Sequence, residues 1–300
     1  MKKTLLLTST SLFCASAFAF PDYEPFADST GSGGTSYATG SILTNQINAS
    51  GRAWYQAGPG TGATPTVAAG DLSVSGLYSA GGGQSAAFGG NGTSARLNLG
   101  IGAGGIMSDT VYFSFAMKLT DLTGLNAGGV FWAGFNNTQG AQNTTPNTVA
   151  TRVVTRTAGA GLFNVGLDKS SGSTPSFVWD PNNYTTSDTI FLVGSYTFNT
   201  GTTTDDVSQL WVNPSSASFG AGSAPGGALS VTAGTDLARV ASFVLYDRSA
   251  NEPAGGLIDD LRFGLSWADV TPTSAPVPEP SCLALATLGI AGLCIRRRSR

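Results

Sequence analysis

The sequence predicts an all-β protein: one two-sheet antiparallel β-sandwich, preceded by an N-terminal signal peptide and followed by a single C-terminal transmembrane helix. Three observations support this prediction. Charged residues make up 11% of the chain, whereas glycine alone accounts for 41 of the 300 residues. Apolar and polar residues alternate in short runs with a period of two, which is typical of half-buried strands. Sustained helical periodicity is missing from the body of the chain.

Residues 1–19 have the features of a secretory signal peptide. Lys2 and Lys3 supply the positive charge, and the mostly apolar stretch that follows them is too short to span a bilayer. Ala17-Phe18-Ala19 forms an A-x-A cleavage site, so the mature chain is expected to start near Phe20. An ordinary core helix is the alternative interpretation of this segment.

Residues 20–270 are predicted to form the sandwich as one domain. The clearest strand runs from Thr110 to Thr120, and its alternate residues Val111 to Leu119 are apolar. Because a slip of one residue would expose this whole apolar set, the register is well specified. Further strands are expected at 95–99, 130–135, 152–157, 162–167, 189–198, 207–212, 240–246 and 257–266. The loop 199–206 is predicted to join two of them as a hairpin.

No inner domain boundary interrupts this stretch, and the first linker is residues 271–277. Its prolines favour an extended spacer between the domain and the C-terminal segment. A closed barrel and a β-helix are the alternatives to the sandwich. The absence of a repeated unit of similar sequence argues against the β-helix.

The C-terminal segment 278–300 has three parts in a fixed order. It starts with Pro278, Glu279 and Pro280, continues with an apolar run from Ser281 to Ile295, and ends with Arg296, Arg297, Arg298 and Arg300. The run would form a helix of about 22 Å, and the arginine stems are expected to extend its reach to the lipid surface. Positive residues beside a spanning helix stay in the cytoplasm, so the tail is expected inside and the main domain outside.

This order of parts resembles the PEP-CTERM sorting signal of exported bacterial proteins, with Pro278, Glu279 and Pro280 matching its motif. The resemblance covers the tail alone. It implies that a membrane protease, an exosortase, cuts near the motif and releases or re-anchors the protein. Together with the signal peptide, it implies passage through the Sec machinery. The expected location is the cell envelope, the outer surface or the medium, with transient anchoring in the inner membrane and the C-terminus in the cytoplasm.

Two further segments resemble strands of laminin-G-like, concanavalin A-like jelly rolls. Gly255 to Phe263 is similar to the closing strand of those domains. Leu210-Trp211-Val212-Asn213-Pro214 is similar to a strand in which an aromatic residue precedes Val and then Asn or Asp. The resemblance implies a two-sheet jelly roll. It implies no particular ligand, because such domains bind sugars, proteins or nothing known.

Composition removes several classes of chemistry. There is no histidine, which excludes a Ser-His-Asp triad, a Cys-His pair and most zinc sites. The cysteines, Cys14, Cys282 and Cys294, lie in the terminal segments, so the mature domain has no disulfide and no thiol nucleophile. Residues 20–277 carry 17 acidic and 9 basic side chains, and their net charge of −8 disfavours nucleic acid as a partner. No catalytic residue is predicted.

Candidate ligand-binding residues lie in one aromatic segment. They are Trp179, Asp180, Asn182 and Tyr184. Two aromatic rings among polar side chains in an expected loop suit a polysaccharide. Trp54, Tyr55 and Trp132 are further candidates for stacking on sugar rings. The alternative is that Trp179 anchors the core at a strand end and that the rest is a turn.

Calcium is the candidate cofactor, and three aspartates are its candidate ligands. Asp259 is expected on the apolar face of its strand with Leu257 and Leu261, where a carboxylate needs a partner. Calcium, backbone amides and an arginine are the alternatives for that partner. Asp205 and Asp206 end the predicted hairpin loop, where acidic side chains either hold calcium or cap the turn.

The sequence as a whole predicts an exported, non-enzymatic cell-envelope or extracellular-matrix protein whose sandwich binds polysaccharide or adheres. Two alternatives stay open. The first is a glycan hydrolase or lyase on the same fold, which would have to use aspartate, tyrosine and arginine because histidine is missing. The second is a purely structural matrix subunit.

Overall fold

The computed structural model describes residues 20–274, apart from residues 61, 63–64, 100–104, 171–175 and 249. The predicted signal peptide 1–19, residues 275–277 of the linker and the sorting segment 278–300 lie outside the described residues. No helix among the described residues is long and apolar enough to cross a membrane. Their helical elements are α1 (Trp267–Val270) and the 3-10 helices η1 (Thr30–Ser32), η2 (Leu43–Asn45) and η3 (Ser216–Ser218).

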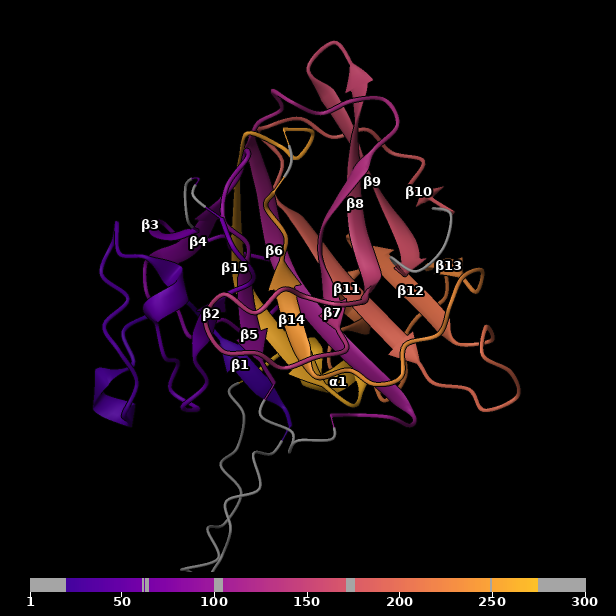
Figure 1. The fold of residues 1–300 in the computed structure, drawn as a ribbon, viewed down its shortest axis with the longest axis horizontal. Coiled ribbons are helices and arrows are strands. Elements are labelled where there is room, and N and C mark those ends of the chain that lie inside the picture. Colours follow the sequence, from indigo (N-terminus) through magenta and orange to yellow (C-terminus); the bar gives the residue numbers. More distant parts are fainter. Residues whose placement is uncertain are drawn as a thin grey trace, which may run out of the picture. The chain divides into compact units, whose positions relative to one another are not determined.

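The described strands form two antiparallel sheets, which Figure 1 shows as two layers. The eight-stranded sheet consists of β1 (Asp22–Glu24), β3 (Thr66–Ala69), β4 (Gln84–Phe88), β6 (Thr110–Asp121), β11 (Ile190–Thr197), β12 (Val207–Val212), β13 (Leu229–Val231) and β15 (Gly255–Gly264). Its order is β13-β12-β11-β6-β15-β4-β3, and β1 pairs with β15.

The seven-stranded sheet consists of β2 (Trp54–Gln56), β5 (Ala95–Asn98), β7 (Val130–Asn136), β8 (Val149–Gly159), β9 (Leu162–Ser170), β10 (Val178–Trp179) and β14 (Ser242–Leu245). Its order is β10-β9-β8-β7-β14-β5-β2. Both sheets contain strands from the two halves of the chain, so the sandwich forms only when distant segments pair.

The predicted two-sheet antiparallel sandwich is confirmed. Each predicted strand has a counterpart, and β11 and β12 pair antiparallel around the predicted hairpin loop. The sequence pattern does not predict the short strands β1, β2, β3, β4, β10 and β13, which have two to five residues each. Runs of that length hold too few residues to show an alternation of period two, and their position depends on longer neighbouring strands.

Aromatic rings from both sheets fill the space between them. Phe113 of β6 contacts Phe135 and Phe243 of the seven-stranded sheet edge to face, with ring centroids 5.0 Å and 5.3 Å apart. Phe115 of β6 contacts Trp132 of β7 in the same way at 5.8 Å. All five side chains are fully or almost fully buried. Edge-to-face pairs add to the free energy gained by burying large rings, so this cluster stabilises the packing of the two sheets.

A β-bulge in β15 contradicts the predicted position of Asp259. Asp260 has a φ of 54°, and the pairing of β15 with β6 shifts register between Asp259 and Arg262. Ile258 and Leu261 therefore both reach the core, although their numbers differ by three and a regular strand would place them on opposite faces. The expectation that Asp259 shares the apolar face with Leu261 is wrong, because the extra residue reverses the alternation of the strand.

Apolar side chains also cover part of the outer face of the eight-stranded sheet. Phe191 of β11 and Trp211 of β12 point away from the inter-sheet core and pack against Phe219, Trp267 and Val270. Trp211 and Trp267 meet edge to face with centroids 5.1 Å apart. Helix α1 and the segment after β12 therefore form a second, smaller core on this side.

Replacing Gly194 by alanine tests the packing between the sheets. Gly194 of β11 is the Cα partner of Phe113, and an added Cβ would clash with the ring of Phe113. We expect a loss of about 1–3 kcal/mol in the free energy of unfolding, because the ring is held by its aromatic neighbours. Urea denaturation measures this loss. The control is Gly31→Ala, whose Cβ meets nothing within 4 Å and should change stability by less than about 0.5 kcal/mol. Equal midpoints for the two variants would contradict the packing described.

Candidate functional site

The outer face of the seven-stranded sheet carries a row of residues that crosses four strands. Phe131 of β7 is the Cα partner of Val154 in β8, and Val154 is the partner of Gly166 in β9. Gly166 is in turn the partner of Trp179 in β10. Paired residues of neighbouring strands project on the same side of a sheet. The register therefore brings Phe131 and Trp179 onto one face, although they are distant in sequence.

Two glycines make room for the indole ring of Trp179. A Cβ at Gly166 or at Gly129 would approach atoms of this ring to 2.7 Å or 2.5 Å, so a side chain at either position would displace it. The guanidinium of Arg156 lies over the indole, with Cζ 4.2 Å from the ring centroid. Nε of Arg156 donates to Oδ1 of Asn164 at 3.1 Å. The half-buried indole therefore lies against the sheet and attracts a cation to its face.

A second aromatic pair lies on the same face. Phe131 and Tyr246 are both half-buried, and their ring centroids are 4.8 Å apart at an angle of 34°. Cζ of Arg152 lies 4.6 Å from the centroid of Phe131, and Cζ of Arg248 lies 5.2 Å from that of Tyr246. Burial lowers the pKa of Arg152, and its ion pair with Asp168 opposes that shift. The two rings thus lie between two guanidinium groups.

Arginines gather on this outer face. They are Arg96, Arg152, Arg156 and Arg248, four of the nine basic residues between 20 and 277. Arg96 of β5 is the Cα partner of Tyr55 in β2 and of Val244 in β14. The half-buried ring of Tyr55 is therefore on the same face. In a domain with a net charge of −8, this face is a local concentration of cationic groups.

Of the four residues predicted to bind a ligand, Trp179 lies on this face and the other three contact one another. Tyr184 is buried against Phe163, and its hydroxyl donates to Oδ2 of Asp180 at 2.5 Å. Burial and Asp180 both raise the pKa of Tyr184. Asn182 is exposed, and its Nδ2 donates to both oxygens of Asp180 at 3.3 Å. The ring of Tyr184 therefore packs inward while that of Trp179 lies outside.

Two other aromatic residues named from the sequence, Trp54 and Trp132, are 1% exposed. Nε1 of Trp54 donates to Oε2 of Glu24 at 2.9 Å, and the hydroxyl of Tyr37 donates to the same oxygen at 2.7 Å. Burial raises the pKa of Glu24 to about 7. Both indoles are thus part of the interior, and of this group Tyr55 alone reaches the outer face of the seven-stranded sheet.

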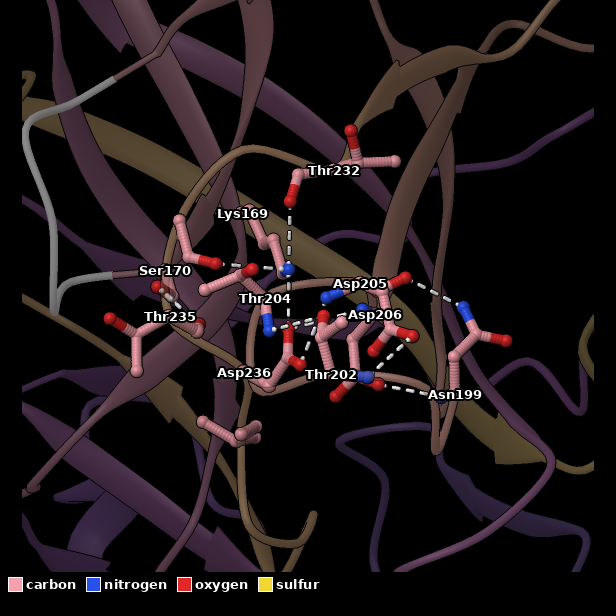
Figure 2. A network of polar contacts seen from close by, with 12 residues as sticks. Lys169, Ser170, Asn199, Thr202, Thr204, Asp205, Asp206, Thr232, Thr235 and Asp236 are labelled. Carbon is pink, nitrogen blue, oxygen red and sulfur yellow. Dashed lines mark hydrogen bonds and ion pairs between the residues drawn. The ribbon is translucent and has the colours of Figure 1, made fainter.

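The two aspartates of the hairpin loop come together with Asp236. Carboxylate oxygens of Asp205, Asp206 and Asp236 lie within 4.8 Å of one another, and Figure 2 shows them beside Lys169. Nζ of Lys169 donates to Oδ1 of Asp236 at 2.5 Å and to the carbonyl of Thr232 at 2.8 Å. This side chain is fully buried, so its ammonium is a fixed countercharge for the aspartates.

Hydrogen bonds within the chain occupy most of the carboxylate oxygens of this trio. Asp236 accepts from the backbone amides of Asp205 and Asp206 at 3.0 Å and 3.1 Å. Asp206 accepts from the hydroxyl of Tyr196 at 2.7 Å and from the amide of Asn199 at 2.6 Å. Oδ1 of Asp205 has no hydrogen-bond partner. The trio has the oxygen ligands that calcium prefers, but a calcium ion would compete with the ammonium and these amides.

A cavity of about 450 Å³ lies beside the trio. Its lining includes Met107, Phe198, Thr202, Asp206 and Asp236. A glycosidase needs one carboxyl group that gives up a proton and a second that acts as base or nucleophile. Here the four oxygens of Asp206 and Asp236 all accept hydrogen bonds from amides, a hydroxyl or an ammonium.

Asp259 belongs to a different part of the molecule. Its Oδ2 accepts from the amide of Leu72 at 2.9 Å, and its Oδ1 accepts from the amide of Asp260 at 2.7 Å. Burial raises the pKa of Asp259 to about 8, and the two amide donors oppose that shift. Calcium ligands are ionised carboxylates, and backbone amides already occupy both oxygens of Asp259.

The C-terminal residues 276–298 match the protein-family model of the PEP-CTERM protein-sorting motif. The chain carries a PEP-CTERM sorting motif. The matched range contains Pro278, Glu279 and Pro280, the apolar run from Ser281 to Ile295, and the first arginines of the tail. The resemblance inferred from the order of these parts is therefore confirmed.

Solved structures of β-rich domains are similar to this PEP-CTERM chain at low identity. The endo-β-1,4-glucuronan lyase from the fungus Trichoderma reesei is 11% identical with a TM-score of 0.38, and the match covers 74% of this chain and 98% of the lyase. The binding domain of botulinum neurotoxin serotype D is 14% identical with a TM-score of 0.39, covering 75% of this chain and 47% of the toxin chain.

The receptor binding domain of the botulinum neurotoxin C/D mosaic serotype is 12% identical with a TM-score of 0.37, and the match covers 82% of this chain and 50% of that one. The chain therefore spans about half the length of the two toxin chains it matches. No curated protein matches its sequence.

Sequence reasoning misses much of the outer face. The spacing of Arg152 and Arg156 predicts that both lie on one face of a strand. It does not predict that Phe131 lies under Arg152 or that Tyr246 lies beside Phe131. The register shifts between Phe131 and Phe135 hide which side Phe131 faces. Arginine and aromatic residues at alternate positions of paired strands would indicate this face, but the strand order must be known first.

Proposed function

We propose that the chain is an exported, non-enzymatic protein of the cell envelope or extracellular matrix, whose sandwich binds polysaccharide through the outer face of its seven-stranded sheet. The observation that carries this proposal is the juxtaposition of half-buried Phe131, Tyr246 and Trp179 with guanidinium groups on that face. Flat aromatic rings offer apolar surface to the C–H faces of sugars, and guanidinium N–H groups donate to sugar oxygens.

Delivery of this domain rests on the sorting motif at residues 276–298. An exosortase-type protease and the Sec machinery are the partners proposed for it. The C-terminal apolar run would hold the protein in the inner membrane during processing, with Arg296, Arg297 and Arg298 on the cytoplasmic side. The final location is the cell envelope, the outer surface or the medium.

Replacing Pro278, Glu279 and Pro280 together by alanine tests this route. We expect the variant to keep its C-terminal segment and stay in the membrane fraction, because the protease loses its recognition motif. Intact mass of the protein recovered from cells and from medium measures both ends of the processed chain. Pro272→Ala, in the linker, is the matched control and should leave processing unchanged. Identical masses and locations for the triple variant and the unaltered chain would contradict the proposal.

The outer face of the eight-stranded sheet is covered by other parts of the chain, which supports placing the binding site on the seven-stranded sheet. On the outer side of the eight-stranded sheet, Phe191 and Trp211 are buried beneath Trp267 and Val270 of helix α1 and the segment that follows β12. On the outer side of the seven-stranded sheet, the rings of Tyr55, Phe131, Trp179 and Tyr246 are half-buried. A polymer has more aromatic surface to contact on the second face.

The proposal assigns no catalytic residue. The carboxylates of Asp206 and Asp236 line a cavity, but each oxygen accepts a hydrogen bond and a buried lysine neutralises Asp236. These contacts support a role in closing the hairpin loop. The tightly bonded state of the pair disfavours the alternative of a glycan hydrolase that uses these two carboxyl groups.

A pair of tyrosines provides a matched test of the binding face. We expect Tyr246→Ala to weaken binding of whichever glycan the full-length protein retains on a broad array by about tenfold, because the aromatic pair of Phe131 and Tyr246 loses one of its two rings. Tyr78→Ala, a half-buried tyrosine before β4, should change affinity less than about twofold. Isothermal titration calorimetry measures both. Equal losses in the two variants, or no glycan retained by the unaltered protein, would contradict the proposal.

A further inference from the structure

Arg96 is a buried charge without a countercharge. Its side chain is 0% exposed, and one guanidinium nitrogen donates to the carbonyl of Thr144. The other two nitrogens, Nε and NH1, have no hydrogen-bond partner. Arg96 forms no ion pair with a carboxylate in the described part of the chain. A fully buried guanidinium in this state is unfavourable, because it has lost its hydration and gained only part of its hydrogen bonds.

The guanidinium of a second arginine, Arg248, reaches the same loop as that of Arg96. A Cβ at Gly58 would clash with NH2 of Arg248 and meet Oγ1 of Thr145 at 3.1 Å. Thr145 follows Thr144, whose carbonyl accepts from Arg96. Burial lowers the pKa of Arg96, and the positive charge of Arg248 lowers it further. Arg248 donates to the carbonyl of Ala57, its Nε has no partner, and it too forms no ion pair among the described residues. An anion bound between these two guanidinium groups would offset their mutual repulsion and accept hydrogen bonds from their unused N–H donors.

The nearest acidic residues in sequence do not supply that anion. Asp247 precedes Arg248, and its Oδ2 accepts from the amide of Gly89 at 3.2 Å. Burial raises the pKa of Asp247 to about 6. Oε2 of Glu252 accepts from the backbone amide of Arg248 at 2.8 Å, which fixes the turn that presents the Arg248 side chain.

The loop between β7 and β8, residues 137–148, covers Arg96. Asn98 holds this loop through two hydrogen bonds with Gly140, of 3.1 Å and 3.2 Å. Gln142 reaches the carbonyl of Thr44 at 2.9 Å. The backbone amide of Asn143 also donates to the carbonyl of Gln56 at 3.0 Å. None of these contacts belongs to the pairing of β5 with β14, so lifting the loop would leave that pairing intact. Arg248 is half-buried beside Tyr246 and connects the covered site with the outer face.

We propose that Arg96 and Arg248 together bind an oxyanion substituent of a glycan, a carboxylate or a sulfate ester, beneath the loop 137–148. This inference rests on the proposed function, because it names the class of polysaccharide that the same outer face takes. The sugar ring contacts the exposed parts of Tyr246 and Phe131, and its anionic group accepts hydrogen bonds from the unused N–H groups of the two arginines. A planar guanidinium matches a carboxylate or a sulfate with two parallel hydrogen bonds.

Selectivity follows from charge. The domain carries a net charge of −8 and repels polyanions elsewhere on its surface. An acidic polymer therefore gains affinity only where guanidinium groups receive its anionic substituents. We expect an acidic polysaccharide to bind at least tenfold more tightly than an uncharged one of similar length, and both arginines to be needed for that difference.

Titration of the full-length protein in detergent with polygalacturonate, dextran sulfate and uncharged dextran tests the inference. The unaltered protein should prefer at least one of the two polyanions, and the preferred one tells a carboxylate from a sulfate ester. Arg248→Gln should lower affinity for that polyanion at least tenfold more than it lowers affinity for dextran, because dextran loses a hydrogen bond but no charge pairing. The control, Lys118→Gln, removes one positive charge on the outer side of the eight-stranded sheet and should change neither affinity more than twofold.

Inorganic sulfate provides an arm that does not depend on any polysaccharide. Low-millimolar sulfate should raise the melting temperature of the unaltered protein and of Lys118→Gln, and raise that of Arg96→Met and Arg248→Gln less. Arg96→Met should melt no lower than the unaltered protein in the absence of anions, because it removes an uncompensated buried charge. Equal sulfate responses in all four proteins would overturn the anion site.

The two proposals fail in different ways. Equal binding of charged and uncharged polymers, unaffected by Arg248→Gln, would overturn the anion site while leaving polysaccharide binding intact. Failure to bind any polymer, with the arginine-dependent sulfate response preserved, would contradict the polysaccharide function and support the anion site.

Discussion

Packing of aromatic rings between the two sheets is the interaction on which the rest of this molecule depends. All cysteines lie outside residues 20–274, so the exported domain has no disulfide to stabilise it. Phe113 and Phe115 on β6 meet Phe135, Phe243 and Trp132 on the opposite sheet. Strands from distant parts of the chain must pair before these rings can meet. Stability and topology therefore have one source, and the outer faces are free to carry polar and cationic groups.

The outer faces use this freedom differently. Helix α1 and the segment after β12 cover part of the eight-stranded sheet with a second apolar cluster. The seven-stranded sheet keeps half-buried rings on its outer side, and arginines lie over three of them. Glycines at 129 and 166 leave the space in which one indole lies against the strands. The ion pair of the buried Lys169, on β9, with Asp236 stabilises the hairpin loop and takes no part in the aromatic face.

The sequence predicts the long strands well, because alternation over eleven or twelve residues specifies both the element and its buried side, as in β6. Six short strands, β1, β2, β3, β4, β10 and β13, escape prediction because their partners define them. A single bulge at Asp260 is enough to turn Asp259 away from the core, and no local signal marks that bulge. The candidate face is less predictable still, since Phe131, Tyr246 and Arg248 meet only through strand order. The PEP-CTERM motif was readable because its information is contiguous in the chain.

Hydroxyl-radical footprinting of the full-length protein with its bound glycan tests the central claim most directly, because it reads the exposure of aromatic side chains one by one. Binding at the outer face of the seven-stranded sheet predicts reduced oxidation of Phe131, Trp179 and Tyr246, with unchanged oxidation of Tyr78 and Tyr112 on the other sheet's side. Protection of Tyr78 or Tyr112 without protection of Tyr246 and Phe131 would contradict the account.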